Sequence, residues 1–324
     1  MDWIKNYIKF LDCVNPQDLR VEEAMQLKNK NLPPKLYKYR PATDYAIKNL
    51  ATDTVWLNTP SEYNDPFEFA EYIDFSKLQA PINGKAEFDI VADFATKYPV
   101  PQDVVMTARE ASDPLEFLID YALGNEGRSK EQISVFKSVM RQVIEDQYAD
   151  VQQWKIDFMQ EQMKVCSFCE SHEQLLMWSH YADYHTGFCV EYNTSLWPDD
   201  DIRRRLLYPI IYQGHRYDVT AHLMQNLIGS DGFNPLYAII SGSTKSTEWS
   251  YEKEWRFIFN IGGTFPKQNY RMDCQSKVFL GYRMAPERKS EIIAICNSRR
   301  IPVFQAGPSG NCYKLTFKEI PANK

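Results

Sequence analysis

The segment WSYEKEWRFIF, Trp249–Phe259, decides both the fold and the site that we expect. Its second half is rich in aromatic and branched residues, which predicts a buried strand. Glu252 and Glu254 lie at the entrance of that strand, and at a spacing of two both side chains would point to one face. A carboxylate among aromatic rings loses hydration, which is unfavourable unless the group is paired or has a function. Either the two acids face a shared functional space, or they form ion pairs with Lys253 or Arg256.

The composition is that of an ordinary globular protein with an unusually high aromatic content. The 324 residues are 44% hydrophobic and 25% charged, which is enough to bury one large core. Aromatic residues make up 14% of the chain, and such residues also line pockets for flat ligands. The net charge of −6 excludes a general basic surface for nucleic acid.

The cysteines and the first residues predict a cytoplasmic protein without membrane association. Seven cysteines, an odd number, are scattered from Cys13 to Cys312, which is typical of reduced thiols. The first residues are too acidic for a signal peptide, and no apolar run reaches membrane-spanning length. The close pair Cys166 and Cys169 has no second pair at zinc-finger spacing, so no metal site is expected.

Periodicity predicts an N-terminal helix over residues 1–30 and a helical insertion over residues 72–163. The insertion ends in a long amphipathic helix with apolar residues every three or four positions: Ile133, Phe136, Met140, Ile144, Tyr148, Val151, Trp154 and Phe158. Strands are predicted at 36–40, 54–58, 164–169, 187–192, 206–212, 254–260, 276–282, 301–305 and 312–319. Further helices are predicted at 43–51, 172–184, 216–228, 234–241 and 286–298.

This order of elements favours an α+β fold with a strand-rich, mixed or antiparallel core. Helices do not alternate strictly with strands, which argues against a doubly wound sheet. The chain has no glycine-rich phosphate loop and only 13 glycines, so a Rossmann or P-loop protein is excluded.

Three further segments combine polar and aromatic side chains. In Tyr37–Arg40 the two tyrosines share one strand face, and Arg40 could hold a phosphate or carboxylate unless this is a solvated edge strand. Asn64 and Asp65 either cap their own turn or meet the hydroxyl groups of a ligand.

The third segment is Met177–Tyr192, a predicted helix followed by a strand. His180 and His185 are five residues apart, which does not match the zinc-protease spacing of four, so a metal is weakly supported. His180 is therefore either a hydrogen-bonded core or pocket residue or a catalytic group. Glu191 lies within an apolar strand and needs a partner.

Taken together, these segments resemble a bacterial and phage family known only as domain of unknown function 2971 (DUF2971). The resemblance implies a single elaborated DUF2971-like domain over residues 1–324, but no function. The matching segments are Leu36–Arg40, Pro60–Phe67, Cys166–Phe168, Met177–Glu191 and Trp249–Phe257.

A second, looser resemblance is to ADP-ribosyltransferases, which have a split, strand-rich core. These enzymes use an Arg or His on the first core strand, an aromatic or hydroxyl residue on a middle strand, and a Glu at the head of a later strand. Arg40 matches the first position, and Glu252 with Glu254 resembles the paired acids of the last. The middle position would be Ser179 or Tyr181, which lie on a predicted helix.

This second resemblance implies an enzyme that uses NAD as a substrate and modifies nucleic acid or protein, as a toxin or phage-defence effector would. Glu254 would stabilise an oxocarbenium-like state, Glu252 would activate the acceptor, and Arg40 would neutralise the pyrophosphate. His180 is the fourth catalytic candidate. Contacts to the nucleotide or other small ligand are expected from Tyr37, Tyr39, Asn64, Asp65, Trp178, Ser179, Tyr181, Glu191 and Arg256.

Two other hypotheses remain open from the sequence. A metal-dependent nuclease or phosphodiesterase could be built from Asp65, His180, Glu191 and Glu254, because clusters of acids and histidine hold divalent ions. A non-catalytic sensor or interaction module would instead use the aromatic motifs as core and pair its acids with Arg256, Arg40 or backbone groups. In that case no cleft would join the four segments.

Overall fold

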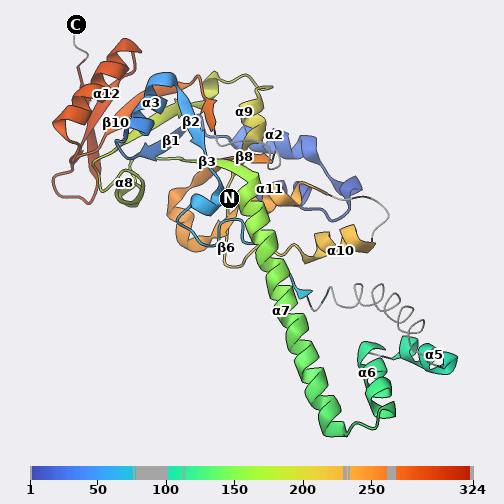
Figure 1. Cartoon of the computed structure of the whole chain (residues 1–324). Coiled ribbons are helices and arrows are strands. Elements are labelled where there is room, and N and C mark those ends of the chain that lie inside the picture. Colours follow the sequence, from blue (N-terminus) through green and yellow to red (C-terminus); the bar gives the residue numbers. More distant parts are fainter. Residues whose placement is uncertain are drawn as a thin grey trace.

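An eight-stranded mixed sheet forms the centre of the molecule, in the order β12-β11-β10-β4-β1-β3-β8-β5 (Figure 1). All neighbouring strands are antiparallel except β10 and β11, which are parallel. This computed structural model describes residues 2–75, 77, 101–111, 114–228, 232, 234–260 and 268–321. The strands are β1 Lys35–Arg40, β3 Met163–Cys169, β4 Phe188–Asn193, β5 Leu207–Pro209, β8 Glu254–Asn260, β10 Gln275–Leu280, β11 Val303–Pro308 and β12 Leu315–Ile320. The predicted α+β class with a mostly antiparallel core is confirmed.

Two short strand pairs lie beside the main sheet. β2 Thr54–Leu57 pairs antiparallel with β9 Gln268–Arg271, and β6 Ile211–Gln213 pairs parallel with β7 Thr244–Ser246. The single strand predicted at 206–212 is therefore divided into β5 and β6. Pro209, the last residue of β5, cannot donate a ladder hydrogen bond, so pairing with the main sheet ends there.

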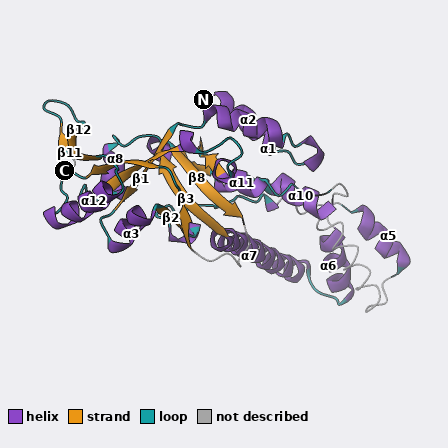
Figure 2. Ribbon diagram, turned by 90° about the horizontal axis from the view of Figure 1, so that it is seen from above, coloured by secondary structure: helices purple, strands orange, loops and turns teal. Residues whose placement is uncertain are grey.

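One face of the sheet is covered by helices α3 Asp44–Thr52 and α12 Pro286–Ser298 (Figure 2). Thr43 caps α3, as predicted, because its side chain accepts a hydrogen bond from the backbone N–H of Ala46. The largest core cluster lies on this face and includes Leu36, Phe168, Val190, Tyr192, Trp255, Phe257, Val278, Ile292 and Cys296.

The opposite face is covered in two separate parts. Helix α8 Leu175–Tyr181 packs over one end, where Trp178 contacts a cluster formed by Tyr37, Tyr39, Cys189 and Phe279. Helices α1 Asp2–Leu11 and α11 Tyr237–Gly242 pack over the other end, around Val165 and Ile258. This division of the core leaves room between the two parts.

The N-terminal region is two helices, where the sequence predicted one over residues 1–30. α1 is followed by a short 3-10 helix, η1 Pro16–Asp18, and by α2 Val21–Asn31. Pro16 lacks a backbone N–H, and the Asn15 side chain accepts a hydrogen bond from the N–H of Gln17. These two residues form a cap that starts a new turn, so the first helix cannot continue.

Much of the predicted 72–163 insertion is helical. It contains α5 Gln102–Glu110, α6 Pro114–Asn125 and α7 Lys130–Gln162, whereas residues 78–100 lie outside the described part. Ser129 and Gln132 form a capping box at the start of α7, and its last residue leads directly into β3. Figure 1 shows α7 running away from the sheet, with α6 and α5 near its far end.

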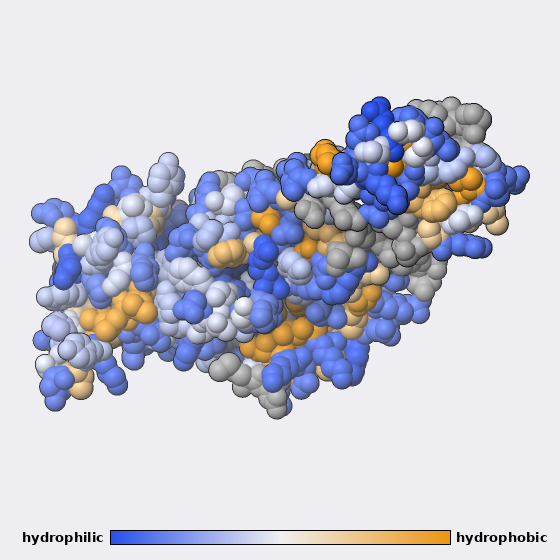
Figure 3. Space-filling view, turned by 90° about the horizontal axis from the view of Figure 1, so that it is seen from below, coloured by the Kyte–Doolittle hydropathy of each residue, from blue (hydrophilic) through white to orange (hydrophobic). Residues whose placement is uncertain are grey.

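The remaining elements are short. They are α9 Ile202–Leu206, α10 Thr220–Ile228, η2 Pro60–Glu62, η3 Thr194–Leu196 and η4 Thr247–Glu252. Seen from below, the surface is mainly hydrophilic with several separate hydrophobic patches (Figure 3). Within the described residues, no helix combines the length and the apolar character that crossing a bilayer requires. All seven cysteines are free thiols, and Cys166 and Cys169 of β3 belong to different core clusters.

Candidate functional site

A pocket of about 460 Å³ opens where strands β1 and β3 diverge. These neighbouring strands are paired at one position of their described residues, Tyr37 with Cys169, whereas β1 pairs along its whole length with β4. All four sequence segments contribute to the wall. It consists of Tyr37, Lys38, Tyr39, Trp56, Asn58, Glu62, Tyr63, Asn64, Ser167, Phe168, Cys169, Met177, His180, Tyr181, Lys245, Glu252 and Glu254.

The two acids of the opening motif do face one space, but the backbone that places them is not a continuous strand. Glu252 is the last residue of η4, and Glu254 is the first residue of β8. Lys253 between them has a left-handed backbone with φ 45°. The strand alternation that predicted the shared direction was therefore wrong, because this turn reorients the chain. The carboxylates converge on Lys245, whose Nζ lies 2.8 Å from Glu252 Oε2 and 3.3 Å from Glu254 Oε2.

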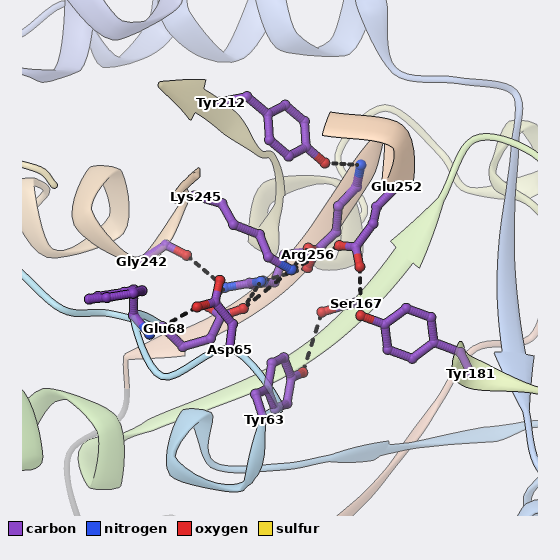
Figure 4. A network of polar contacts seen from close by, with 12 residues as sticks. Tyr63, Asp65, Glu68, Ser167, Tyr181, Tyr212, Gly242, Lys245, Glu252 and Arg256 are labelled. Atoms are coloured by element: carbon purple, nitrogen blue, oxygen red, sulfur yellow. Dashed lines mark hydrogen bonds and ion pairs between the residues drawn. The ribbon is translucent and has the colours of Figure 1, made fainter. Parts of the chain in front are cut away.

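Glu254 belongs to a buried ionic network, in which Figure 4 shows Glu68, Lys245 and Arg256 close together. Arg256 Nε donates to Glu254 Oε1 at 2.7 Å. The two Nη atoms of Arg256 donate to the carboxylate of Glu68 at 2.7 and 2.9 Å. Lys245 Nζ also lies 3.5 Å from Glu68 Oε1. A bidentate arginine–carboxylate pair fixes both partners in orientation, so Glu254 is held rigidly at the pocket floor.

The network carries more negative than positive charge. Its three carboxylates, Glu68, Glu252 and Glu254, face the two cations Lys245 and Arg256. Burial favours protonation of Glu254, but the charges of Arg256 and Lys245 outweigh it and lower the pKa of Glu254 to about 2. Burial and the neighbouring charge of Glu254 raise the pKa of Glu252 above its ordinary value. Of Glu252 and Glu254, Glu252 is therefore the acid that takes up a proton at the higher pH.

Hydroxyl groups complete the polar floor of the pocket. Tyr181 OH donates to Glu252 Oε1 at 2.5 Å. Tyr63 OH accepts a hydrogen bond from Ser167 Oγ at 3.3 Å, and Ser167 lies beside Arg256 in the register of β3 and β8. The Tyr212 hydroxyl accepts the backbone N–H of Glu254 at 2.8 Å, which anchors the start of β8.

Seven of the predicted site residues line this pocket: Tyr37, Tyr39, Asn64, His180, Tyr181, Glu252 and Glu254. His180 lies on the exposed side of α8, at the pocket wall. Arg256 lies directly behind Glu254 and is fully buried, so it contacts the acids and not the cavity.

Arg40 does not line the pocket, although the sequence grouped it with Glu252 and Glu254. Along β1, Tyr37 and Tyr39 belong to the cluster under α8, whereas Leu36 belongs to the cluster on the opposite face. Arg40 shares a strand face with Leu36 and Lys38, but it lies two residues beyond Lys38 at the end of β1 and is not part of the pocket lining. The basic residue of β1 that reaches the pocket is Lys38, whose Nζ donates to the carbonyl of Ser167 at 2.9 Å across the gap between β1 and β3.

Four other candidates do not line the pocket and have partners of their own. Asp65 accepts a hydrogen bond from the N–H of Phe67 at 2.9 Å, the turn cap that the sequence offered as its alternative. Trp178 is buried and donates to the carbonyl of His172. Ser179 Oγ lies 3.3 Å from His185 Nε2. Glu191, for which the sequence required a partner, accepts hydrogen bonds from Tyr37 OH at 3.0 Å and from Ser276 Oγ at 2.9 Å.

These positions separate the residues of the metal-site hypothesis. His180 and Glu254 line the pocket, whereas Asp65 and Glu191 do not and have the hydrogen-bond partners given above. Across the described ranges, no group of three or more His, Cys, Asp or Glu side chains has a geometry suited to a metal ion.

Sequence patterns did not reveal several residues of this site, among them Lys38, Tyr63, Glu68, Ser167 and Lys245. Lys245 lies in the polar run 243–247, which has no periodicity, and Glu68 is 188 positions from Arg256. A signal was available for Ser167, because it is the hydroxyl residue of the predicted strand 164–169 and lies at its middle.

Comparison with known proteins agrees with the motif resemblance. The family model described as protein of unknown function (DUF2971) matches residues 177–257. No curated protein and no solved structure matches the chain. The matched segment runs from α8 to β8 and includes Tyr181, Lys245, Glu252 and Glu254 of the pocket. Residues 177–257 are therefore similar to this family, and the matched segment includes the motifs Met177–Glu191 and Trp249–Phe257 and both acids of the pocket.

Proposed function

We propose that this protein is an ADP-ribosyltransferase that uses NAD as the donor substrate. The observation that carries the proposal is the convergence of four distant segments on one aromatic-walled pocket whose floor holds an excess carboxylate. The pocket volume of about 460 Å³ lies within the range typical of small-ligand sites. An excess negative charge in a partly desolvated site favours a ligand or transition state that carries positive charge.

The chemistry of NAD cleavage has this requirement. The bond between C1′ of the ribose and the nicotinamide nitrogen breaks, and its electron pair neutralises the pyridinium ring. The sugar then passes through an oxocarbenium-like state, as in glycoside hydrolysis. An acceptor nucleophile forms a new bond to C1′ and loses its proton to a base.

Glu252 suits the role of that base, because it faces the pocket and its pKa is raised. Glu254 stays ionised at neutral pH and stabilises the cation electrostatically, since its pKa is about 2. Tyr181 OH orients the Glu252 carboxylate through its hydrogen bond.

The phosphates of NAD need a cation in the pocket, and Lys38, which is part of the lining, supplies one. In the resemblance to ADP-ribosyltransferases, Lys38 then takes the place first expected for Arg40 on the same strand. Ser167 on β3 takes the middle-strand hydroxyl position that Ser179 or Tyr181 was expected to fill. The side chains of Trp56, Tyr63 and Phe168 provide surfaces for stacking.

The acceptor of the ADP-ribose would be a nucleic acid or a protein. A cytoplasmic toxin or an antiviral defence effector fits this activity, because modification of one essential molecule can stop the growth of a cell or a phage.

The experiment incubates purified protein with NAD labelled in the nicotinamide and adenosine parts, together with cell-extract protein and RNA. We expect release of nicotinamide and transfer of the adenosine label to an acceptor. Glu252→Gln should lower the rate by about 10²-fold or more. Glu248→Gln should leave it unchanged, because Glu248 is exposed on the same 3-10 helix. If the wild type neither binds NAD nor releases nicotinamide with any acceptor, the proposal is wrong.

A further inference from the structure

A second pocket of about 220 Å³ adjoins the main pocket, and the proposed reaction does not use it. We call it the side pocket, and its lining comes from Phe67, Ala70, Ser241 and the segments 213–217 and 244–246. The two pockets share one lining residue, Lys245. Strands β6 and β7 are parallel, and Gln213 pairs with Ser246, so both strands end at this place. The side pocket is therefore built at the carboxyl ends of two paired strands, next to the main pocket.

The side pocket differs from the main pocket in the charge of its lining. Acids line the main pocket, whereas none of the described residues that line the side pocket is an Asp or a Glu. Arg216 contributes a cation to the side pocket, and His215 adds an imidazole. Lys245 is engaged elsewhere, because its Nζ contacts the carboxylates of Glu252 and Glu254. The side pocket therefore suits an anionic group, and Arg216 is the cation that can bind it.

The guanidinium group of Arg216 has no carboxylate partner. It lies over the ring of Tyr72, with Cζ 5.8 Å from the ring centroid. Within the described ranges the Arg216 side chain forms no ion pair and donates no hydrogen bond. Its N–H groups are thus available, and their planar arrangement matches two oxygens of a phosphate group.

Two serine hydroxyls add further donors to the side pocket. Ser241 is 3% exposed, and its hydroxyl has no hydrogen-bond partner in the part of the chain that the structure describes. A buried hydroxyl without a partner is unfavourable, which is consistent with a ligand oxygen as its acceptor. Ser246 Oγ accepts the backbone N–H of Glu248 at 3.3 Å, so its own proton is free to be donated. An arginine together with hydroxyl donors is a set of groups that binds phosphate oxygens.

We propose that the side pocket binds a backbone phosphate of a single-stranded nucleic acid. Its volume of about 220 Å³ is below the range typical of a site for a whole small ligand, so it suits one charged group of a larger molecule. Phe67 lines the same pocket and is 61% exposed, so a base beside the bound phosphate can stack on its ring. Phosphate contacts combined with stacking on aromatic side chains are the means by which proteins hold single strands.

Such a nucleic acid would be the acceptor in the proposed transfer, and this role rests on the proposed function. A strand bound at the side pocket lies one residue, Lys245, away from the main pocket. A neighbouring nucleotide can then supply the nucleophile, which forms the new bond to C1′ of the ribose as nicotinamide leaves and gives its proton to Glu252. Binding of the strand itself requires neither NAD nor catalysis.

The first test measures binding of labelled single-stranded RNA and DNA of about ten nucleotides by fluorescence anisotropy, without NAD and over a range of salt concentrations. Arg216→Met should weaken binding about tenfold at low salt. It should also lower the slope of log K against log salt by about 0.7, the value for one lost phosphate contact on a single strand. The melting temperature should not change, because Arg216 is exposed.

Arg283→Met is the matched control for this test. Arg283 is also exposed and lies over a tyrosine ring, Tyr282, at 5.9 Å, but it lines neither pocket. This variant should retain the wild-type affinity and the wild-type slope. If the wild type binds neither RNA nor DNA, or if both arginine variants have the same slope, the side pocket does not hold a phosphate of a nucleic acid.

The second test separates a nucleic acid from a phosphorylated protein. A phosphopeptide of the same net charge carries phosphates but no bases. Phe67→Ala should weaken oligonucleotide binding about tenfold and leave phosphopeptide binding unchanged. Tyr313→Ala is the control, because Tyr313 is 99% exposed and lines neither pocket. Tighter binding of the phosphopeptide than of the oligonucleotide by the wild type would overturn the choice of nucleic acid.

Failure of the side pocket and failure of the transferase activity are distinguishable. Nicotinamide release that depends on Glu252, together with oligonucleotide binding that does not depend on Arg216, would overturn the role of the side pocket alone. Oligonucleotide binding that depends on Arg216, without release of nicotinamide on any acceptor, would overturn the proposed function alone.

Discussion

The pocket and the α7 helix depart from the usual distribution of polar and apolar groups in opposite ways. The pocket floor buries five charged side chains within one network, whereas α7 leaves six large apolar side chains in contact with solvent. Buried charges and exposed apolar rows are the informative exceptions in a folded protein, because both are unfavourable without a partner. The comparison teaches that the two exceptions are resolved differently: the buried charges of the pocket are paired with one another, whereas the apolar row of α7 is left in contact with solvent by the described part of the chain.

The largest effect is expected from removing the central cation of the pocket network. Arg256→Met leaves the carboxylates of Glu68 and Glu254 buried without their main partner. We expect the free energy of unfolding to fall by about 3–5 kcal/mol, measured by urea denaturation. Arg271→Met is the control, because that arginine is exposed and its ion pair with Asp273 is in solvent, so its unfolding midpoint should not change. If the two variants had equal stability, the network would not be the strong structural element described above.

Smaller effects on stability, opposite in sign, are expected from replacing Glu254 and Glu252. Glu254 has a lowered pKa, so its ionised form stabilises the fold above the ordinary pKa of 4.5, and this contribution is lost as the pH falls toward about 2. Glu252 has a raised pKa, so its contribution is present below pH 4.5 and is lost as the pH rises through that raised value. At pH 7, Glu254→Gln should therefore lower stability by about 3 kcal/mol. Glu252→Gln should increase stability by about 1 kcal/mol, since it removes the excess charge.

Thermal unfolding of both variants from pH 3 to pH 8 checks these signs. The loss caused by Glu254→Gln should shrink as the pH falls below 4.5, whereas the gain from Glu252→Gln should shrink above pH 4.5, as the pH falls through the raised pKa of Glu252. A stabilised variant that has lost activity would mark Glu252 as a functional group, because active sites retain unfavourable charges for their chemistry. Loss of stability in both variants at pH 7 would instead make Glu252 a structural partner of Lys245.

The sequence predicted more of the fold than of the site. β8, β3 and the long helix of the insertion were predicted from local periodicity, which survives into the structure because each element buries one regular face. The helix pattern showed an apolar face on α7, but not that this face is exposed. Whether a face is covered depends on segments far away in the chain, such as α6.

The site was only partly predictable for the same reason. Strand alternation did separate Tyr37 and Tyr39 from Arg40. The pocket is nevertheless lined by Tyr37, Lys38 and Tyr39, from both faces of β1, and this required knowledge that β1 lies next to β3 and parts from it. Glu68 and Lys245 entered the site through long-range ion pairs, and a single sequence carries no periodic signal for these.

The pH dependence of nicotinamide release tests the role of one cation of the pocket, Lys245. Lys245 lowers the pKa of Glu252 by its charge and its hydrogen bond, against the larger opposing effect of burial. In the proposed reaction the ionised carboxylate is the active base, so the rate is expected to fall when the pH drops below the pKa of Glu252. Without the lysine that pKa rises further, and Lys245→Met should move the acid limb of the profile to higher pH. If the acid limb of the Lys245→Met profile does not move to higher pH, Lys245 does not act through Glu252.

The smallest effect on stability and on the release rate is expected from removing the Tyr181 hydroxyl. Tyr181→Phe removes the hydrogen bond to Glu252 Oε1, which also lowers the pKa of Glu252 in the wild type. We expect stability to change by about 1 kcal/mol and the release rate at pH 7 to fall by about tenfold or less. The acid limb should move in the same direction as in Lys245→Met, but by less. Tyr184→Phe is a matched control, because Tyr184 is 71% exposed outside the pocket. Equal profiles for the two phenylalanine variants would mean that the hydroxyl does not orient Glu252, and the role of that acid would then depend on Lys245 alone.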